Sequence, residues 1–498
     1  MFSSISRRNL IAGASACAVA ATTAALAHAE ETAVWDMEAD LVVIGSGGGL
    51  AGAITAAELG LDVLVLEKLD ILGGSCALHS GVVSCGGGTS LQREAGLEDT
   101  PEQYRDFLLA CAKGQANPAL VEALANEIPQ NFEWLRSLGV PFTTEWLYYT
   151  GPEQEPYCTA VTPAIMHGAQ CPPDEAHRTT GIVIHSFVIA EAEAKGVQII
   201  TAATGKHLIT NSAGDVIGIK AEIAGEPKNI KARKGVILNC GGMCNNPQML
   251  AQYMRYGGIR YAAGTKGATG DGIKMGQEIG ADLVNMHESL SSPNCAITLG
   301  TTTRGKERPA YPTILVNKFG QRFVNEDYHS DTVGKLMYGQ EDCAGFQIFD
   351  SASIDACNAA FRDAVVEADT IEELAQALGI KVDGHVKTVN EWNEGARNGE
   401  DPAFGKTGAT VAPLENPPFY GLQVWAYAIV AHFGGLKVDE NCNVIRVDGS
   451  PINRLYACGI DAGGWMGRYY PGSGTSVGGS YSMARIAARN IAALENWE

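Results

Sequence analysis

The chain has 498 residues, more than a single hydrophobic core usually supports, so two domains are expected. Hydrophobic residues make up 46% of it, and this share excludes a mostly disordered protein. The formal net charge of −20 disfavours nucleic acids and anionic membrane surfaces as partners.

Residues 1–29 have the composition of a targeting segment. The pair Arg7-Arg8 precedes a short stretch rich in alanine and threonine, and Ala27-His28-Ala29 matches a cleavage site. The paired arginines indicate the twin-arginine export route, so we expect a periplasmic or cell-surface protein. An ordinary secretory signal or a membrane anchor is the alternative, although the apolar stretch is shorter than the ~20 residues that span a bilayer.

The first elements after this segment form a βαβ pattern. Residues 40–44 are an apolar run typical of a buried strand, the helical stretch 51–59 follows, and 63–66 form a second strand that ends at Glu67. A glycine-rich turn, residues 45–49, separates the first strand from the helix. Such a turn brings backbone N–H groups and a helix N-terminus to a pyrophosphate, and an acid about 20 residues later binds the adenosine ribose. We therefore predict a dinucleotide site at this turn, with Glu67 as the acid.

The register of the glycine motif stays open. With Gly45 and Gly47 as its first two glycines, Leu50 stands where the third is usual. The register Gly47, Gly49, Gly52 restores the whole motif with a shifted turn. The sequence does not decide which glycine contacts the phosphate.

Strands that run into glycines recur far along the chain. Residues 235–242 repeat the pattern, 268–272 open an apparent helix, and the strand 454–461 leads through a glycine-rich loop to a helix at 482–494. Junctions so far apart predict one domain assembled from both ends of the chain, residues 38–285 and 424–498. The predicted fold class is α/β, with a Rossmann-like domain that is split in sequence.

The insertion between these parts, residues 286–423, is predicted to be an α+β capping domain. It contains a strand and turn at 314–320, an extended segment at 323–328 and a helix at 370–378. We expect this domain to close over the reactive part of the bound cofactor.

Thirteen cysteines would ordinarily suggest disulfides in an exported protein. The chain has no CxxC pair, so it encodes neither a zinc ribbon nor a c-type haem site, and we expect no metal ligands. Cys240 with Cys244, and Cys158 with Cys171, remain candidates for an iron–sulfur cluster or a disulfide. Buried free thiols are the alternative that we favour.

Five short motifs lie in order along the chain. They are GGTSLQ at 87–92, EWL at 133–135, FVNE at 323–326, PPFY at 417–420 and YPGSG at 470–474. Together they resemble the superfamily of flavoproteins that contains fumarate reductases and 3-ketosteroid dehydrogenases. The likeness covers essentially all of the chain after residue 29, and it is strongest to the 3-ketosteroid branch and to exported flavoproteins that reduce cardiac glycosides such as digoxin. The resemblance implies an FAD cofactor and an active site at the seam between the two domains.

The resemblance also implies that FAD is held noncovalently. Ser75 occupies the position at which covalently flavinylated relatives carry histidine, and His79 does not lie at that position. The glycine turn and the resemblance together give the expected FAD-binding residues, which are Gly45, Gly47, Gly49, Glu67, Lys68, Gly74, Ser75, Gly81, Gly242, Asp271, Asp461, Ser476 and Val477.

Two positions argue against fumarate as the substrate. Fumarate reductases of this superfamily carry an arginine proton donor after the FVNE motif, where this chain has Ser330. A second arginine clamps the substrate carboxylate in those enzymes, where this chain has Ser476. Loss of both cations removes the charge-assisted contacts that a dicarboxylate needs.

Tyrosines stand near these positions instead. In 3-ketosteroid dehydrogenases a tyrosine after the FVNE motif transfers a proton, and Tyr328 lies about two residues from the usual spacing. The tyrosine and the last glycine of the YPGSG motif polarise the substrate carbonyl in that branch, which assigns these roles to Tyr470 and Gly474. A tyrosine that only packs at the seam is the alternative for Tyr328. His432 lies near the place of a substrate-binding histidine in fumarate reductases, and a structural role is its alternative.

The resemblance implies an ene-reductase or dehydrogenase acting on a C=C bond conjugated to a carbonyl, in a steroid-like enone or an unsaturated lactone. A hydride would pass between FAD and the β-carbon while Tyr328 exchanges a proton at the α-carbon, and Tyr470 and Gly474 would bind the enolate oxygen. An exported flavoprotein without a haem segment is expected to take electrons from a membrane-bound cytochrome and to act as a reductase.

Two alternative functions stay open. A reductase of small unsaturated acids, of the fumarate, cinnamate or urocanate type, needs a cation at the seam, for which Arg468 and Arg304 are the candidates. A flavin-binding electron carrier or sensor would turn over no substrate, but it would have little use for a capping domain.

Overall fold

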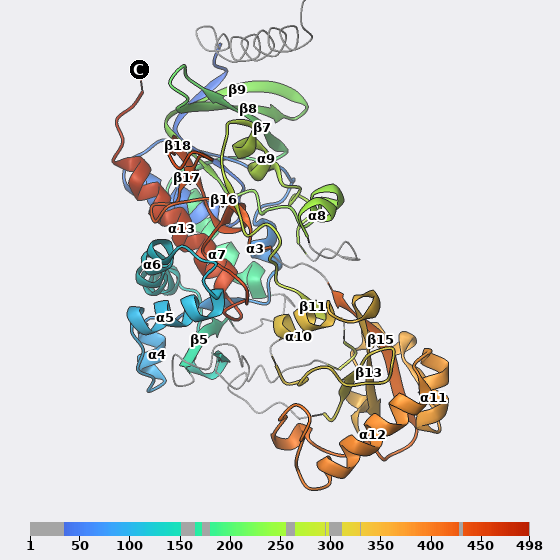
Figure 1. Cartoon of the computed structure of the whole chain (residues 1–498). Helices are drawn as coiled ribbons and strands as arrows, with labels where there is room; N and C mark the ends of the chain where they lie inside the picture. The colour runs from blue at the N-terminus through green and yellow to red at the C-terminus, as the bar shows by residue number, and fades with distance from the viewer. Residues whose placement is uncertain are drawn as a thin grey trace, which may run out of the picture.

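The computed structural model describes residues 34–150, 165–171, 180–254, 264–293, 295–297, 311–328, 330–427 and 432–497. Within these residues the chain forms two bodies, which Figure 1 shows side by side. We call the elements from β11 to β15, with the helices between them, the cap. The remaining elements form the main domain.

The main domain is built on a sheet of eight strands within the described residues, in the order β17-β18-β9-β1-β2-β6, with β7 and β8 joined to it through β9. Its strands are β1 (Met37–Ile44), β2 (Val63–Leu66), β6 (Gln198–Ile200), β7 (Ala203–Thr210), β8 (Val216–Ile223), β9 (Glu226–Leu238), β17 (Asn443–Ile445) and β18 (Pro451–Ala457). β1 lies in the middle and pairs in parallel with β2 and β9. Because its residues 41–43 are buried on both faces, they are uniformly apolar rather than alternating. The predicted Rossmann-like fold class is confirmed.

The carboxyl ends of four parallel strands meet at one edge of this sheet. Ile44 of β1 is aligned with Leu66 of β2 and with Leu238 of β9. Leu238 is in turn aligned with Ala457 of β18. The segments that follow these strands are the glycine turn, Glu67 and the later strand-to-glycine junctions, so the fold brings them together at the place where open α/β sheets bind ligands.

Helices flank this sheet and cover the adjoining loops. The helices of the main domain are α2 (Gly49–Glu58), α3 (Gly74–Leu78), α4 (Ser90–Glu94), α5 (Pro101–Ala112), α6 (Pro118–Ser137), α7 (Thr180–Ala194), α8 (Pro247–Tyr253), α9 (Asp271–Glu278) and α13 (Thr475–Ala492). α13 packs against α2 so closely that a side-chain carbon on Gly52 would lie 2.7 Å from the carbonyl oxygen of Ala484. The start predicted for α13, residue 482, is wrong. The helix begins seven residues earlier, at Thr475, in a segment predicted to belong to the glycine-rich loop.

Two small sheets complete the main domain. One contains β3 (Val82–Ser84), β4 (Leu147–Thr150) and β5 (Ile165–Gln170), and the other contains β10 (Leu283–Val284), β16 (Gly435–Lys437) and β19 (Ala462–Gly463). The second sheet joins residues from before and after the cap, because β16 pairs with both β10 and β19. This pairing closes the main domain at the point where the chain leaves for the cap and returns.

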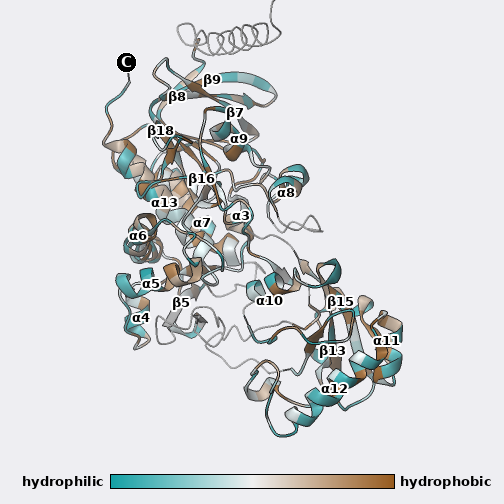
Figure 2. Ribbon diagram, viewed as in Figure 1, coloured by the Kyte–Doolittle hydropathy of each residue, from teal (hydrophilic) through white to brown (hydrophobic). Residues whose placement is uncertain are grey.

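The cap is an α+β unit around a sheet that has five strands in the described part of the chain. Its elements are β11 (Ser292–Pro293), β12 (Ile314–Val316), α10 (Ser330–Met337), β13 (Ala344–Asp350), β14 (Val366–Ala368), α11 (Ile371–Leu378), α12 (Val382–Ala396) and β15 (Phe419–Tyr427). An apolar cluster joins α11 and α12 to β12 and β13, and Figure 2 shows α12 with teal, hydrophilic residues along much of its length. In Figure 1, α10 and β11 lie on the side of the cap that faces the main domain. β15 continues to Tyr427, so this strand spans the domain junction predicted at residues 423 and 424.

Short 3₁₀ helices connect these elements. They are η1 (Thr144–Trp146), η2 (Glu341–Cys343), η3 (Ser351–Ala356), η4 (Ala359–Ala364), η5 (Gly408–Thr410) and η6 (Gly459–Asp461).

Candidate active site

A cavity of about 460 Å³ lies at the edge where the four parallel strands end. Its walls include the glycine turn, the ends of β2 and β9, helix α3 and the loop before α13. Most of the predicted site residues line it, namely Gly45, Gly47, Glu67, Lys68, Gly74, Ser75, Asp271, Tyr470, Gly474, Ser476 and Val477. The predicted residues outside this lining are Gly49, Gly81, Gly242, Asp461 and Tyr328.

The glycine turn presents backbone to the cavity. Gly45 has a φ of +107°, and a side-chain carbon there would lie 2.1 Å from the carbonyl oxygen of Asn239. Gly47 lines the cavity, and a side-chain carbon on Gly49, the first residue of α2, would lie 2.8 Å from Val43 on β1. This arrangement fits the register in which Gly45 and Gly47 are the first two glycines. Gly49 then has the role of the third glycine, which allows the helix to pack closely on the strand.

Glu67 is buried at the end of β2 and holds the glycine turn. Its Oε2 accepts hydrogen bonds from Ser46 N–H (3.0 Å) and Ser46 Oγ (2.5 Å), and its Oε1 accepts one from Leu69 N–H (2.9 Å). A carboxylate has about four acceptor sites. Glu67 can therefore fix Ser46 and still accept a hydrogen bond from a ribose hydroxyl.

His185 supports the same turn from behind, although no sequence motif marks it. Its Nε2 lies 2.9 Å from the carbonyl oxygen of Ser46, and its Nδ1 lies 2.9 Å from the hydroxyl of Tyr481. A carbonyl only accepts, so Nε2 carries the proton and Nδ1 accepts from the tyrosine. Burial lowers the pKa of His185 to about 4, so the ring is neutral near pH 7. His185 is thus a support of the cavity wall.

Asn239 is a second support that the sequence did not indicate. Its Oδ1 accepts from Gly49 N–H (2.9 Å), and its Nδ2 donates to the carbonyl oxygen of Cys458 (3.0 Å). One side chain at the end of β9 therefore ties the start of α2 to the end of β18.

We expect Glu67→Ala to weaken FAD binding by about 1–3 kcal/mol, the scale of a lost hydrogen bond to a charged group. The change removes the anchor of Ser46 and the predicted acceptor for the ribose. Recovery of flavin fluorescence during dilution measures the loss, and Glu58→Ala, at the exposed end of α2, is the matched control. Unchanged flavin occupancy in Glu67→Ala would place the ribose contact elsewhere.

Charged residues close one side of the cavity. Lys68 Nζ donates to Thr269 Oγ1 (2.7 Å) and pairs with Asp271 (2.9 Å), the first residue of α9. Asp461 lies behind the wall, where its carboxylate accepts from the N–H groups of Cys240 and Gly242. Burial raises the pKa of Asp461 to about 6, against the effect of these two hydrogen bonds.

Gly81 and Gly242 serve packing rather than direct contact with the cavity. A side-chain carbon on Gly81 would lie 1.7 Å from Thr180 Oγ1, and one on Gly242 would lie 2.2 Å from His432 Nε2. Neither position has room for a side chain.

Tyr470 and Gly474 lie together where α13 begins. The hydroxyl oxygen of Tyr470 accepts a hydrogen bond from Ser476 N–H (3.1 Å) in the first turn of the helix, and Gly474 is the N-cap. The ring of Tyr470 stacks on Phe433 with centroids 5.9 Å apart, and burial raises the pKa of its hydroxyl. A hydroxyl that accepts one hydrogen bond is a stronger donor in another. The arrangement therefore provides a polarised hydroxyl at the wall of the cavity.

His432 has a structural role. Its Nε2 accepts from Met243 N–H (2.7 Å), and its Nδ1 lies 2.6 Å from the carbonyl oxygen of Gly434, to which it donates. Burial lowers its pKa to about 4, so the ring is neutral and both nitrogens are engaged within the main domain. The geometry supports the structural alternative over substrate binding.

The cavity fits a dinucleotide. Its turn carries no side chain at Gly45 or Gly47, a helix N-terminus adjoins it, and an acid stands at the end of β2. His79 Nδ1 accepts from Gly81 N–H (2.9 Å), so its Nε2 carries the proton, and this atom has no hydrogen-bond partner among the described residues. His79 lines the cavity and can therefore donate to a bound cofactor, while Ser75 provides no histidyl link.

Tyr328 lies in the cap and not in the cavity wall. It packs against the apolar cluster that contains Val324 and Val333. Three residues later, Asp331 Oδ2 accepts a hydrogen bond from Tyr470 N–H (3.0 Å), so the seam passes close to this segment. Proton transfer by Tyr328 stays a prediction.

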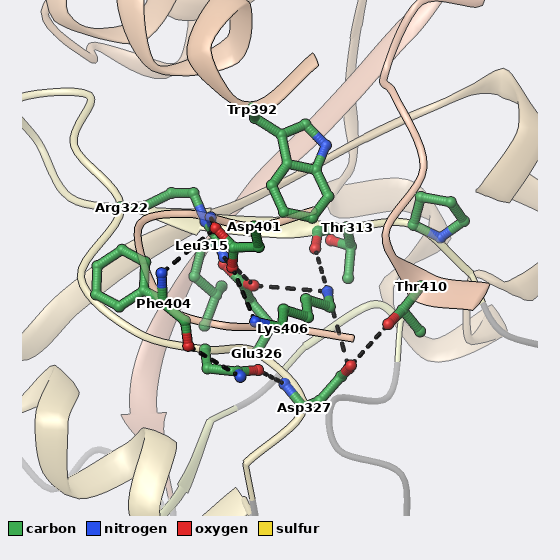
Figure 3. A network of polar contacts seen from close by, with 12 residues as sticks. Thr313, Leu315, Arg322, Glu326, Asp327, Trp392, Asp401, Phe404, Lys406 and Thr410 are labelled. Atoms are coloured by element: carbon green, nitrogen blue, oxygen red, sulfur yellow. Dashed lines mark hydrogen bonds and ion pairs between the residues drawn. The ribbon is translucent and has the colours of Figure 1, made fainter. Parts of the chain in front are cut away.

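The FVNE motif belongs to a buried charge network inside the cap (Figure 3). Arg322 donates to both oxygens of Glu326 (3.0 and 2.8 Å) and to both oxygens of Asp401 (2.8 and 3.0 Å). Lys406 lies 3.5 Å from Glu326 and 3.8 Å from Asp327, on the other side of the network. These contacts fix the motif to the loop after α12, so its glutamate has a structural role.

The cysteines show no metal site in the described part of the chain. No group of three or more His, Cys, Asp or Glu side chains is arranged there to hold a metal ion. Cys171, Cys240 and Cys244 are free thiols, and Cys158 lies outside the described residues. None of the described helices has the length and apolarity to cross a membrane.

Comparison with known proteins agrees with the dinucleotide site. The family model described as an FAD binding domain matches residues 40–477. The urocanate reductase of Eggerthella lenta is 30% identical over 475 residues, which are 92% of this chain and 75% of that protein. The digoxin reductase of the same organism is 28% identical over 512 residues, covering 93% of this chain and 89% of that protein.

Solved structures share the fold. The 3-ketosteroid-Δ4-(5α)-dehydrogenase from Rhodococcus jostii RHA1, in complex with 4-androstene-3,17-dione, matches with a TM-score of 0.80 and 30% identity over 93% of this chain and 99% of that one. The open conformation of a flavocytochrome c3 fumarate reductase matches with a TM-score of 0.70 and 24% identity over 92% and 78% of the two chains, a likeness of fold alone. The chain therefore belongs to the family defined by this FAD binding domain, and it is an FAD-dependent oxidoreductase.

Proposed function

We propose that this enzyme reduces, or forms, a C=C bond conjugated to a neutral carbonyl, in a steroid-like enone or an unsaturated lactone. One observation carries the proposal: Tyr470 and Gly474 lie together on the cavity wall at the N-terminus of α13. The similarity to a digoxin reductase and to a 3-ketosteroid dehydrogenase supports this class of substrate.

The residues of the chain would act on the carbonyl oxygen. Bound FAD supplies or accepts the two electrons of the reaction. Tyr470 Oη–H and the N–H of Gly474 would donate to the carbonyl oxygen, where negative charge develops as the enolate forms. The N-terminus of an 18-residue helix adds positive potential at the same place.

The charges at the seam favour a neutral substrate over a carboxylate. Arg468 lies 3.2 Å from both carboxylate oxygens of the buried Glu288, and Lys335 lies 2.7 Å from Asp331. Each cation is thus neutralised by an acid of the chain, while Arg304 lies outside the described residues. The similarity to a urocanate reductase nevertheless makes a small unsaturated acid the second candidate.

A panel of acceptors tests the proposal. The dithionite-reduced holoenzyme is mixed anaerobically with enones, unsaturated lactones and unsaturated acids, and flavin absorbance reports reoxidation. We expect enones or lactones to reoxidise the flavin. Reoxidation by acids alone would favour the second candidate, and no reoxidation by any compound would favour an electron carrier.

We expect Tyr328→Phe to slow reoxidation by substrate by about 10²–10⁴-fold, the usual scale of general acid catalysis, if Tyr328 donates the α-proton. FAD content and flavin reduction by a chemical donor should stay at wild-type values, because the ring remains in its apolar cluster. Stopped-flow absorbance measures both steps. A wild-type rate of flavin reoxidation in Tyr328→Phe would show that Tyr328 only packs in the cap.

The direction of the reaction follows from the proposed location. Export by the twin-arginine route would place the enzyme where a membrane-bound cytochrome can supply electrons, and the enzyme would then act as a reductase. Removal of Arg7 and Arg8 should retain the protein in the cytoplasm, as cell fractionation would show.

A further inference from the structure

A buried ion pair on α10 of the cap contacts the loop that carries Tyr470. Asp331 and Lys335 are four residues apart on α10, and their charged atoms are 2.7 Å from each other. Asp331 is 0% exposed and Lys335 is 9% exposed. A buried ion pair is weak support for stability, because desolvation offsets its attraction. Stability alone therefore does not explain why this ion pair is buried on α10.

Each member of the pair contacts the main domain. Asp331 Oδ2 accepts from Tyr470 N–H (3.0 Å), and its Oδ1 accepts from Ser291 N–H (2.8 Å). Lys335 Nζ donates to the carbonyl oxygen of Arg468. The backbone on both sides of residue 469 is thus held by one helix of the cap.

Lys335 also reaches the ring system around Tyr470. Its Nζ lies 5.0 Å from the centroid of Phe433 and 5.3 Å from that of Tyr469. Phe433 is the residue on which the ring of Tyr470 stacks. The contacts of the pair are therefore with the backbone of Tyr470, with its neighbours in the chain and with the ring on which it stacks.

The Arg322 network gives a contrast inside the same cap. Its ion pairs join the FVNE motif to the loop after α12, and all of its charged members lie in the cap. The pair on α10 is instead placed between the cap and the cavity wall.

We propose that Asp331 and Lys335 are positioning residues that fix Tyr470 at the cavity and make its placement depend on the docking of α10. This inference rests on the proposed function, because it concerns the group that would polarise the substrate carbonyl. A displacement of about 1 Å in a catalytic group can cost about 10²-fold in rate, so the pair affects turnover without touching substrate.

A double-mutant cycle tests the coupling. In FAD-loaded protein, we expect Lys335→Met to lower kcat about 10- to 100-fold with little change in KM, and Lys335→Arg to restore kcat to within about threefold. In the Tyr470→Phe background, Lys335→Met should lower kcat by less than about threefold, since the group it positions is already missing. Lys387→Met is the matched control, because Lys387 and Glu391 form an exposed i,i+4 pair on α12.

The cycle has outcomes that overturn the inference. If Lys335→Met lowers kcat by the same factor in the wild-type and Tyr470→Phe backgrounds, Lys335 does not act through Tyr470. If Lys335→Met yields no FAD-loaded protein, Asp331→Asn, which keeps the size of the side chain, replaces it with the same expectation. A wild-type kcat in Tyr470→Phe would instead refute the proposed role of Tyr470.

A second measurement does not depend on turnover. Hydrogen–deuterium exchange of the peptide 468–476 in the resting holoenzyme, without substrate, reports how firmly the loop is held. We expect faster exchange in Lys335→Met and wild-type exchange in Lys387→Met, because only the first loosens the contact of Asp331 with Tyr470 N–H. Unchanged exchange in Lys335→Met would overturn the inference even if kcat falls.

Discussion

Replacing Tyr470 by phenylalanine is expected to lower kcat by about 10²–10³-fold with a modest change in KM, the range measured for loss of one oxyanion-hole donor. The hydroxyl accepts Ser476 N–H at the start of α13, and it would meet full negative charge only as the enolate oxygen forms. The phenyl ring can keep its stacking on Phe433, so a packing loss does not imitate the effect. Steady-state kinetics with an enone or lactone acceptor measures the change.

Tyr456→Phe is the matched control for this variant. Tyr456 and Tyr470 are both 6% exposed in the main domain, but Tyr456 does not line the cavity. It should retain the wild-type kcat. A higher KM for Tyr470→Phe with an intact kcat would make Tyr470 a binding residue and contradict the proposed mechanism.

Arg322→Met is expected to destabilise the cap by about 3–5 kcal/mol, the cost of removing one partner from a buried ion pair. Arg322 is doubly paired, with Glu326 and Asp401, and all three side chains are at most 5% exposed. Although burial opposes its charge, these two carboxylates hold the pKa of Arg322 above its usual value. Without the guanidinium, both carboxylates stay buried, and among the described residues Lys406 remains as an ion-pair partner of Glu326 (Figure 3).

Urea unfolding followed by circular dichroism measures this loss. Arg397→Met is the control, because Arg397 forms an exposed pair with Glu415 and should change stability by less than about 1 kcal/mol. Equal stability of Arg322→Met and Arg397→Met would show that the network contributes nothing to the cap.

The βαβ unit was predictable because its signals are local. Buried parallel strands are continuous apolar runs, and the strand predicted at residues 63–66 matches β2 (Val63–Leu66). The glycine turn and Glu67 followed from fixed spacings along the chain. FAD as the cofactor and the class of oxidoreductase are accordingly confirmed.

The start of α13 was not predictable from local composition. Gly478 and Gly479 give the segment the composition of a loop, which is why the helix was predicted to begin at residue 482. In the fold, a side-chain carbon on Gly478 would lie 2.9 Å from Ser84, and one on Gly479 would lie 2.3 Å from Trp465. The glycines permit close packing of the helix, and this requirement depends on residues far away in sequence.

The supports of the site were missed for the same reason. His185 contacts Ser46 across 139 positions and Tyr481 across 296, so no spacing along the chain could reveal its role. Asp331 and Tyr470 are 139 positions apart. Tyr328 was chosen by its distance from a motif, whereas its place in the cap depends on how the segment packs.

The proposed substrate presents a neutral carbonyl to Tyr470 and Gly474. The most direct measurement compares an unsaturated lactone with its own ring-opened carboxylate, which has the same carbon skeleton and an added negative charge. Each compound is mixed with the reduced holoenzyme in an anaerobic stopped-flow instrument, and reoxidation of the flavin is followed. We expect the lactone to reoxidise the flavin at least about 10²-fold faster, because Lys335 and Arg468, the cations described at the seam, are already paired with acids. Faster reoxidation by the carboxylate would contradict the proposal of a neutral substrate.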